Sequence, residues 1–549
     1  MLESRPPCLV QKVDYELKTE AGLLSLAEEL RSYILSFLPC RDILRCTSVC
    51  KALHQTYMSS SELQYIVELS GQRLLPVPNT NNNTSASSCL QTLRDRAHAW
   101  FKFDMYSFKT ITLQEISYSK KKFIADGHIY SWDENNDVAT IIPILPKPSQ
   151  RTVERSWSPG TLRSGPNSIT MDVLMDPAQN LIAIVYYAAH ENDPFGGAVY
   201  IDLKTLDGDG VHPQAAGPTL LLSEPSIFVE TSTKLKCWGR HIALQRSFCM
   251  TPDYGRSRDR KEWKLQIWDW QNSTTSRSVL GDIAVYPSEN NIDFCFVGND
   301  RLLVVVGGDL AVYSIEDVSQ RPQFLACFRL PFPLSDIQCI LPMDHIEQMQ
   351  MQAQPQTVTH TSDPTHQLLC LNASYNTATV VFIISTTIFF ELDEVAATMP
   401  KPWRCWGPLN TRIFWYRYQC QVHVSGNRVL QAIMVDKPNT NPVEYKVRLM
   451  DFSPMAVTNR QGLGCVVKEP STIEMSPFME STTEDNFRIT TSLPYVEVVS
   501  DRKIGVHELQ GIWLDKDRIY LLGSNWDHHV TAYTSYLTWQ SSRLEVINI

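Results

Sequence analysis

Apolar residues are spaced differently in the first 75 residues of the chain and in the rest of it. Between Leu23 and Leu69 they recur at helical intervals, and the segment contains no glycine. From about residue 105 onward, short runs rich in Val, Ile, Leu and aromatic residues are separated by Gly, Asn, Asp and Pro. The first pattern is typical of helices and the second of strands. We therefore expect an α+β multidomain chain, with a small helical N-terminal domain followed by a large all-β domain.

The predicted strands come in pairs that share one pattern. A polar turn, often Asn or Asp followed by Arg, leads into an apolar strand, and the second strand ends in an acidic or Asp-aromatic step. In one pair the step Gly307-Gly308 joins the strands directly, as expected for a tight hairpin, since glycine tolerates positive φ. The clearest pairs are 180–188 with 198–204, 240–248 with 264–271, 301–307 with 310–316, 428–436 with 445–452, and 517–524 with 544–549.

Recurrence of such pairs over a few tens of residues predicts a β-propeller of six to seven blades. The step Ile267-Trp268-Asp269-Trp270 is similar to a degenerate ending of a WD repeat, although the strict Gly-His…Trp-Asp signature is absent. A pair of β-sandwiches or another all-β array is the alternative. The polar inserts at 251–263, 347–364 and 455–486 are expected to be loops, either partner-binding segments on the rims of the propeller or simple padding.

The spacing of apolar residues and the local composition divide the chain into four predicted segments. These are an N-terminal tail (1–21), the helical domain with its following helix (22–75), a polar linker with a connecting helix (76–104), and the all-β domain (105–549). Residues 76–88 are too polar to bury much surface, so a flexible loop is expected there. A helix is expected at 90–103, with Leu93, Ala97 and Trp100 on one face.

Composition and charge exclude several classes of function. The chain has 549 residues and a net charge of −10 with no long Lys/Arg run, which argues against nucleic acid as the main partner. The N-terminus lacks the apolar segment of a secretory signal, and the apolar run 380–390 is too short for a membrane span. That run is expected to be a buried pair of strands. The 14 cysteines include no Cys-x-x-Cys pair and no zinc-ligand spacing, so we expect reduced thiols, no metal, no cofactor, and a cytoplasmic or nuclear location.

The helical segment predicts three short helices in about 35 residues. Ser25 and Glu28 fit a capping box that starts the first helix, which places Leu26, Leu30, Tyr33, Ile34 and Phe37 on one broad face. The step Leu38-Pro39 ends it. Asp42 is expected to start the second helix and Thr47 to cap the third. A unit this small buries little core and usually needs a partner to complete it.

This segment resembles the F-box. The F-box pattern runs Leu-Pro-x-Glu-[Ile/Leu], then [Ile/Leu]-[Phe/Leu]-x-x-Leu, then Asp-[Leu/Ile]-Leu, then Val-Cys-[Arg/Lys]. The corresponding steps here are Leu26-Ala27-Glu28-Glu29-Leu30, Ile34-Leu35-Ser36-Phe37-Leu38-Pro39, Asp42-Ile43-Leu44 and Val49-Cys50-Lys51. The main departure is Ala27, which stands where the pattern has a proline that contributes to the adaptor contact. More loosely, 61–74 and 176–181 resemble the large F-box families of mushroom-forming fungi, in which an all-β region follows the F-box.

The resemblance implies a substrate-recognition subunit of an SCF-type cullin-RING ubiquitin ligase. Such a subunit docks on a Skp-type adaptor and holds a target protein, here by the all-β domain, near the ubiquitin-conjugating enzyme. It needs surfaces and no catalytic groups, so no enzyme is expected, and no P-loop, Gly-x-Ser-x-Gly or His-Glu-x-x-His motif occurs. The docking residues that the resemblance implies are Leu26, Ala27, Leu30, Ile34, Leu38, Pro39, Ile43, Leu44, Val49 and Cys50, about half of which are expected to form the internal core instead.

Two alternatives remain open. The chain could bind the adaptor in an assembly that serves trafficking or regulation without ubiquitin transfer, or it could be a propeller hydrolase, for which the sequence offers no constellation of residues. Substrate-binding residues are not assigned. Arginines grip phosphate in propellers that read phosphorylated targets, but none of Arg240, Arg246 and Arg404 is singled out for that role.

Overall fold

The computed structural model describes most of the chain in two compact units, a helical unit and a β unit. The helical unit comprises residues 22–70 and 85–94, and the β unit comprises 71–77 and 95–548 with gaps. The described residues are 22–77, 85–102, 108–113, 121–145, 152–158, 160–163, 168–190, 193–222, 230–249, 261–284, 292–341, 360–376, 378–392, 398–416, 420–435, 442–458, 464–475, 487–515, 518–526 and 540–548.

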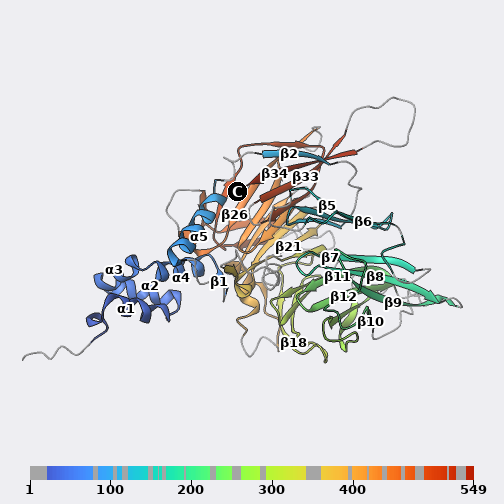
Figure 1. Cartoon of the computed structure of the whole chain (residues 1–549), viewed down its shortest axis with the longest axis horizontal. Coiled ribbons are helices and arrows are strands. Elements are labelled where there is room, and N and C mark those ends of the chain that lie inside the picture. Colours follow the sequence, from blue (N-terminus) through green and yellow to red (C-terminus); the bar gives the residue numbers. More distant parts are fainter. Residues whose placement is uncertain are drawn as a thin grey trace, which may run out of the picture. The chain divides into compact units, whose positions relative to one another are not determined.

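The helical unit packs short helices around a small apolar core (Figure 1). Its elements are the 3-10 turn η1 (Leu23–Ser25) and the helices α1 (Glu28–Ser36), α2 (Cys40–Val49), α3 (Lys51–Ser59) and α4 (Ser61–Gly71), together with the first part of α5 (Ala86–Trp100). The core residues are Leu35, Ile43, Leu53, Leu63, Val67, Leu69, Leu90 and Leu93, none of them more than 6% exposed.

The helix ends differ in detail from the sequence prediction. The capping box does not form, because η1 places Ser25 in a turn where its hydroxyl donates to the Gly22 carbonyl (2.7 Å), and Ala27 becomes the N-cap of α1. Pro39, and not Asp42, precedes α2, since a proline with φ of −56° suits a helix start. Thr47 lies inside α2 and donates to the Leu44 carbonyl, while Cys50 precedes α3.

The β unit is a seven-bladed propeller, which confirms the predicted architecture and fixes the number of blades. Blade 1 contains β3 (Lys121–Ala125), β4 (His128–Asp133), β5 (Val138–Pro143) and β6 (Arg155–Trp157). Blade 2 contains β7 (Ser168–Asp176), β8 (Leu181–His190), β9 (Asp193–Thr205) and β10 (Thr219–Leu221). Blade 3 contains β11 (Glu230–Trp238), β12 (His241–Cys249), β13 (Lys261–Asp269) and β14 (Ser278–Ala284). Blade 4 contains β15 (Ile292–Val297), β16 (Arg301–Val306), β17 (Asp309–Ser314) and β18 (Gln323–Arg329).

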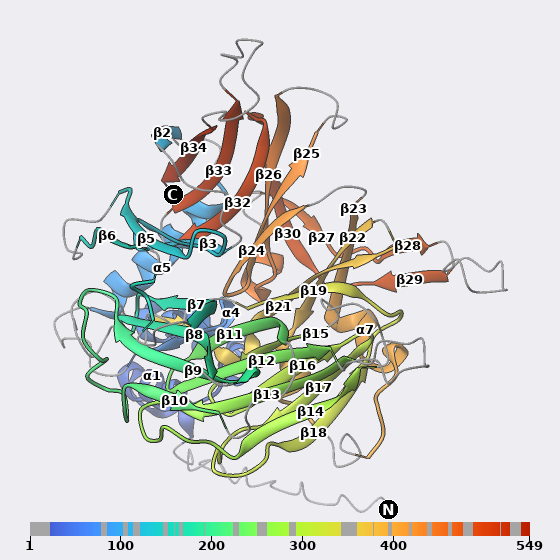
Figure 2. The same ribbon diagram turned by 90° about the vertical axis from the view of Figure 1, so that its right-hand side faces the viewer.

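The remaining blades carry the insertions of the fold. Blade 5 contains β19 (Ser335–Ile340), β21 (Leu368–Tyr375), β22 (Ala378–Ser385) and β23 (Thr411–Tyr416). Blade 6 contains β24 (Gln421–Ser425), β25 (Arg428–Met434), β26 (Val443–Asp451), β30 (Tyr495–Val499) and β27 (Cys465–Val467), with β31 (Ile504–Val506) also pairing with β26. Blade 7 contains β32 (Glu508–Asp515), β33 (Arg518–Trp526), β34 (Gln540–Asn548) and β2 (Phe108–Leu113). Figure 2 shows the sheets around a common centre, with the first strand of each blade innermost.

The ring is closed by a strand from the beginning of the propeller unit. β2 pairs antiparallel with β34 from Phe108 opposite Ile547 to Leu113 opposite Ser542. The hydroxyl of Thr110 donates to both carboxylate oxygens of the buried Glu545, at 2.9 and 3.0 Å. The outer strand of blade 7 therefore comes from the segment that follows the linker.

The five strand pairs predicted from the sequence are confirmed as β8–β9, β12–β13, β16–β17, β25–β26 and β33–β34. The Gly307-Gly308 step forms a two-residue turn between Val306 and Asp309, and Gly307 has a positive φ of 57°. The apolar run 380–390 was predicted wrongly as two strands. It forms one buried strand, β22, followed by the 3-10 turn η4 (Thr386–Phe389).

Two insertions near blade 5 are ordered. Between β22 and β23, η4 and helix α7 (Trp403–Asn410) pack Phe389 and Trp406 into the core shared by blades 4 and 5. The segment predicted as a loop at 455–486 instead contains β27 and β28 (Ser471–Met475), and β28 pairs with β29 (Phe487–Thr491). Most of the predicted inserts at 251–263 and 347–364 lies outside the described residues.

The segments at the two ends of the predicted linker are integral parts of the propeller, and the first of them begins two residues before it. Strand β1 (Leu74–Pro76) pairs antiparallel with β20 (His360–Ser362), which lies between the first two strands of blade 5. Trp100, at the end of α5, is 2% exposed and lies under the guanidinium of Arg428, 5.0 Å from its ring centre. The predicted flexible loop falls mostly outside the described residues. We call the side of the propeller that these segments contact, where the first strand of each blade turns into the second, the linker face, and the other side the distal face.

Candidate functional site

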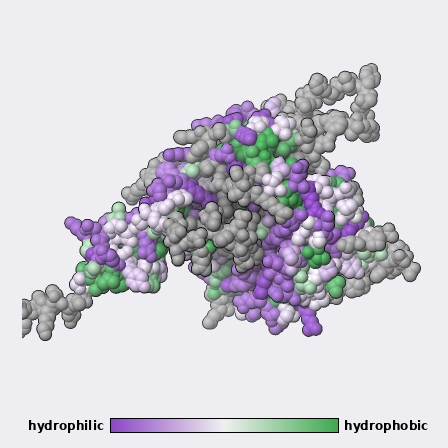
Figure 3. Space-filling model, in the orientation of Figure 1, coloured by the Kyte–Doolittle hydropathy of each residue, from purple (hydrophilic) through white to green (hydrophobic). Residues whose placement is uncertain are grey.

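A concentration of exposed apolar side chains marks the helical unit. Val49 is 76% exposed, Phe37 71% and Tyr33 61%, values unusual for such residues in a folded domain. Figure 3 shows hydrophobic surface on the helical unit over α1. We call this set the apolar face, and it consists of Leu23, Leu24, Leu30, Tyr33, Ile34, Phe37, Leu44, Val49 and Met58.

Local sequence explains why these side chains point outward. In α1 the exposed apolar residues Leu30, Tyr33 and Ile34 lie on one stripe of the helix, which Phe37 continues. Leu35 lies about 100° further round and faces the internal core, at 1% exposure. In α2 the adjacent residues Ile43 and Leu44 point about 100° apart, so that Ile43 is fully buried and Leu44 is 45% exposed. Four helices of 9 to 11 residues provide too little interior for every apolar residue that they carry.

The residues predicted from the resemblance fall into three groups. Ala27, Leu30, Ile34, Pro39, Leu44 and Val49 are exposed; Leu26, Leu38 and Cys50 are partly exposed; Ile43 lies inside the helical unit. The prediction did not include Leu23, Leu24, Tyr33, Phe37 and Met58, which belong to the same apolar face. The sequence did indicate Tyr33 and Phe37, because their spacing places them one turn apart on the broad face of the first helix. In the structure their rings meet edge to face, with 4.9 Å between the ring centres.

Polar contacts fix the helices behind this face. The Ser32 hydroxyl donates to the Ser60 hydroxyl (2.7 Å), and Ser59 donates to the Glu28 carboxylate. The side-chain amide of Gln64 donates to the Met58 carbonyl at 2.8 Å. These contacts join α1, α3 and α4, so the apolar face is presented on braced helices.

The chemistry available at the helical unit is association. Burial raises the pKa of Tyr57 above its ordinary value, so this phenol stays neutral near pH 7. Within the described residues, no group of three His, Cys, Asp or Glu side chains is placed to hold a metal ion. Fully burying an apolar side chain is worth about 1.5–3 kcal/mol, so nine half-exposed ones represent gross stabilisation on the order of 10 kcal/mol. Association costs a comparable amount, so shape complementarity and polar contacts must supply the remainder.

The three arginines considered from the sequence do not converge in the propeller. Arg240 lies 3.3 Å from Asp269 at the linker face of blade 3. Arg246 is buried within blade 3, with its guanidinium over the ring of Phe248. Arg404 is exposed on α7, in the insertion of blade 5.

None of the helices in the described part of the chain combines the length and apolarity that a membrane span requires.

Comparison with known proteins supports the reading of the helical unit. The F-box domain family matches residues 23–56, which run from the start of η1 into α3. No curated protein matches the chain.

Several solved structures are similar to the chain at low identity and low TM-score. Prolyl oligopeptidase B from Galerina marginata, bound to a 25mer macrocyclization substrate, is 11% identical with a TM-score of 0.30, and the match covers 80% of this chain and 56% of that one. A puromycin-hydrolyzing peptidase of Mycobacterium tuberculosis is 11% identical, with a TM-score of 0.29 and coverages of 78% and 51%. The phage phi92 endosialidase is 6% identical, with a TM-score of 0.30 and coverages of 81% and 70%. The chain thus spans about half the length of the two peptidases.

The sequence pattern, the braced helices with their outward apolar face and the family match agree on residues 23–56. The chain contains an F-box domain at residues 23–56, followed by a seven-bladed β-propeller.

Proposed function

We propose that the chain is the substrate-recognition subunit of an SCF-type cullin-RING ubiquitin ligase. The observation that carries the proposal is the apolar face of the F-box domain. A surface of nine exposed apolar side chains on braced helices is typical of a site that a partner covers. F-box domains bind Skp-type adaptors, so the proposed occupant is such an adaptor.

In this proposal Leu30, Ile34, Leu44 and Val49 contact the adaptor directly, together with Tyr33 and Phe37. The partly exposed Leu26, Leu38 and Cys50 line the edge of the contact, and Ala27 and Pro39 contribute their exposed surfaces at the helix starts. Ile43 supports the contact from inside, since its side chain fills the core behind Leu44.

The propeller is the proposed substrate-binding domain. Its linker face is already contacted by β1 and by Trp100, so the distal face and the rim are the surfaces proposed for a target protein. Holding a target beside the charged conjugating enzyme raises the effective concentration of its lysines, which requires no catalytic group in the receptor. We therefore propose a non-enzymatic role, in the cytoplasm or nucleus.

A pull-down with a recombinant Skp-type adaptor tests the docking proposal with two matched variants. Val49→Asp places a charge at a 76% exposed position of the apolar face, and Leu409→Asp does the same at a 76% exposed position on α7 of the propeller. Because a carboxylate would be desolvated in the contact, Val49→Asp is expected to weaken binding about 100-fold, or about 3 kcal/mol. Leu409→Asp should bind like the wild type, and both should keep the wild-type circular dichroism.

Failure of the wild-type chain to bind would reject the docking proposal and would indicate that Ala27, in place of the family's proline, matters. If the adaptor binds but no cullin joins the complex, and a captured partner is not turned over through ubiquitin, the chain acts as a non-ligase scaffold.

A further inference from the structure

The innermost strands of the propeller carry four lysines in the described part of the chain, all on blades 1 and 3. Three of them face carboxylates. Lys121 pairs with Asp172 of blade 2, and Lys236 and Lys234 lie 3.0 and 3.7 Å from Asp293 of blade 4. Lys122 differs, because its Nζ donates to the neutral side-chain amide of Gln510 (Nζ–Oε1 2.6 Å).

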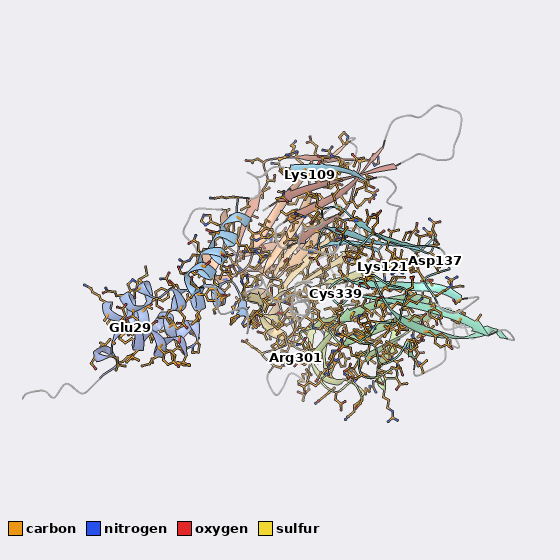
Figure 4. The ribbon with its side chains drawn as sticks, in the orientation of Figure 1. Glu29, Lys109, Lys121, Asp137, Arg301 and Cys339 are labelled. Carbon is orange, nitrogen blue, oxygen red and sulfur yellow. The ribbon has the colours of Figure 1, made fainter. Side chains whose placement is uncertain are left out.

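Lys122 lies at the seam where blade 7 meets blade 1. Strands β3 and β32 run side by side there, and the apolar contacts of the seam include Ile124 and Trp513. Since successive residues of a strand point to opposite sides, Lys121 reaches blade 2 while Lys122 reaches blade 7. Figure 4 labels Lys121, the neighbour of Lys122 on β3.

The charged groups around Lys122 do little to stabilise its ammonium form. From β32 only Glu508 acts on it, and this side chain is exposed, so solvent weakens its attraction. On β3, the charge of Lys121 is already neutralised by the fully buried Asp172. Burial outweighs Glu508 and lowers the pKa of Lys122 to about 8. About a fifth of this amine is then neutral at pH 7.4, against about 0.1% for an ordinary lysine.

We propose that Lys122 is a site of covalent acylation, whose amine accepts an acyl group from small acyl thioesters. As a whole residue, Lys122 remains partly exposed. The neutral nitrogen attacks the thioester carbonyl, a C–N bond forms, and the C–S bond breaks. The thiolate leaves and takes up the proton that nitrogen loses, so no oxidant or reductant is needed.

Acylation removes one positive charge from the seam that closes the ring. The product amide keeps one N–H, which can still donate to Gln510, so the seam remains bridged while its charge changes. The site is thus suited to modification without opening the propeller. It is independent of adaptor docking, because it lies wholly within the propeller unit.

The test measures acetylation of each lysine in the full-length chain by peptide mass spectrometry, with S,N-diacetylcysteamine as the thioester between pH 6.5 and 10.5. At pH 7.4 Lys122 has about 200 times as much neutral amine as an ordinary lysine. Because a less basic amine is also a weaker nucleophile, the expected acetylation rate at Lys122 is roughly tenfold that of an ordinary lysine. The exposed Lys109 on β2, also labelled in Figure 4, is the internal reference. The rate at Lys122 should level off near pH 8, whatever the access of the reagent.

Gln510→Glu provides the matched variant. A carboxylate at this position would stabilise the ammonium form of Lys122. The pH at which the acetylation rate of Lys122 levels off should therefore rise by at least one unit, while the labelling of Lys109 stays the same. The proposal is overturned if Lys122 follows Lys109 up to pH 10, if Gln510→Glu leaves the profile unchanged, or if Lys122 is not labelled while Lys121 is.

Discussion

Trp100 offers a direct test of the finding that the end of the connecting helix α5 belongs to the propeller core. Its side chain is 2% exposed and packs among residues of blades 6 and 7, including Leu430 and Ile547. Replacing a buried aromatic side chain by alanine costs about 3–5 kcal/mol, because the lost transfer free energy adds to the cost of the cavity. Loss of the stacking with Arg428 adds about 0.5–1 kcal/mol. We therefore expect Trp100→Ala to lower the free energy of unfolding by about 4 kcal/mol.

The assay is urea unfolding of the full-length chain followed by tryptophan fluorescence and circular dichroism. Trp100→Phe is the conservative variant and should lose less than half as much, since most of the apolar contact remains. Trp238→Ala is the matched control, because Trp238 is only partly buried and donates to Asn299 at 3.0 Å. Its loss should cost about 1–2 kcal/mol.

Hydrogen exchange locates the effect. With Trp100→Ala, amides of β25 and β34 should exchange faster than those of β16, which lies in blade 4 away from Trp100. A loss below about 1 kcal/mol, or equal acceleration in all blades, would refute the placement of Trp100 in the core of blades 6 and 7.

Three further predictions concern other parts of the propeller. Arg412→Leu should cost about 3 kcal/mol in urea unfolding and speed hydrogen exchange in β28 and β29, because the buried guanidinium donates to the Glu469 and Thr491 carbonyls and to Ser471. A wild-type exchange rate in this hairpin would contradict the reasoning. Thr110→Val should cost about 2 kcal/mol in the same assay, since the buried Glu545 loses the bifurcated hydrogen bond from the Thr110 hydroxyl. The cost should be smaller in a Glu545→Gln background, where Thr110 donates to a neutral amide oxygen. Burial lowers the pKa of His423 to about 4, so between pH 6.5 and 4 the unfolded chain binds a proton that the folded chain does not. Stability should therefore fall over this window by about 2 kcal/mol more in the wild type than in His423→Gln, and equal pH profiles would refute the shift.

Local pattern predicted the blades well because each blade is made largely of neighbouring segments. The pairs β8–β9 and β16–β17 join strands that follow one another, and the turn at Gly307 requires a residue that tolerates positive φ. The partner of β2 was not predictable in this way. Its register with β34 joins residues more than 400 positions apart, and nothing in the local sequence of either strand specifies the other.

The same contrast holds for the F-box domain. The resemblance to the F-box implied that both Ile43 and Leu44 contact the adaptor. Adjacent helix residues point in different directions, however, and only the packing of the helices decides which one faces the core. The Ser25–Glu28 capping signal failed because the turn η1 offered the Ser25 hydroxyl a competing acceptor in Gly22. The loop predicted at 455–486 was wrong in part, since the hairpin β28–β29 gains order through contacts with β23 that its own sequence does not reveal.

Hydrogen bonds between inner strands join neighbouring blades of the ring. The buried carboxylate of Asp172 on β7 accepts the backbone N–H of Leu235 in the next blade (2.9 Å), and that of Asp293 on β15 accepts the N–H of Cys339 (2.6 Å). Each acid also faces a lysine from a neighbouring inner strand, so its charge is compensated where it is buried. These contacts join first strands to one another, whereas the Trp-Asp step of a WD repeat lies at the end of a third strand, as Trp268-Asp269 does on β13. From blade 1 to blade 5, inner-strand acids and lysines therefore join each blade to the next, and because these residues belong to no repeated motif, a search for a sequence period does not reveal them.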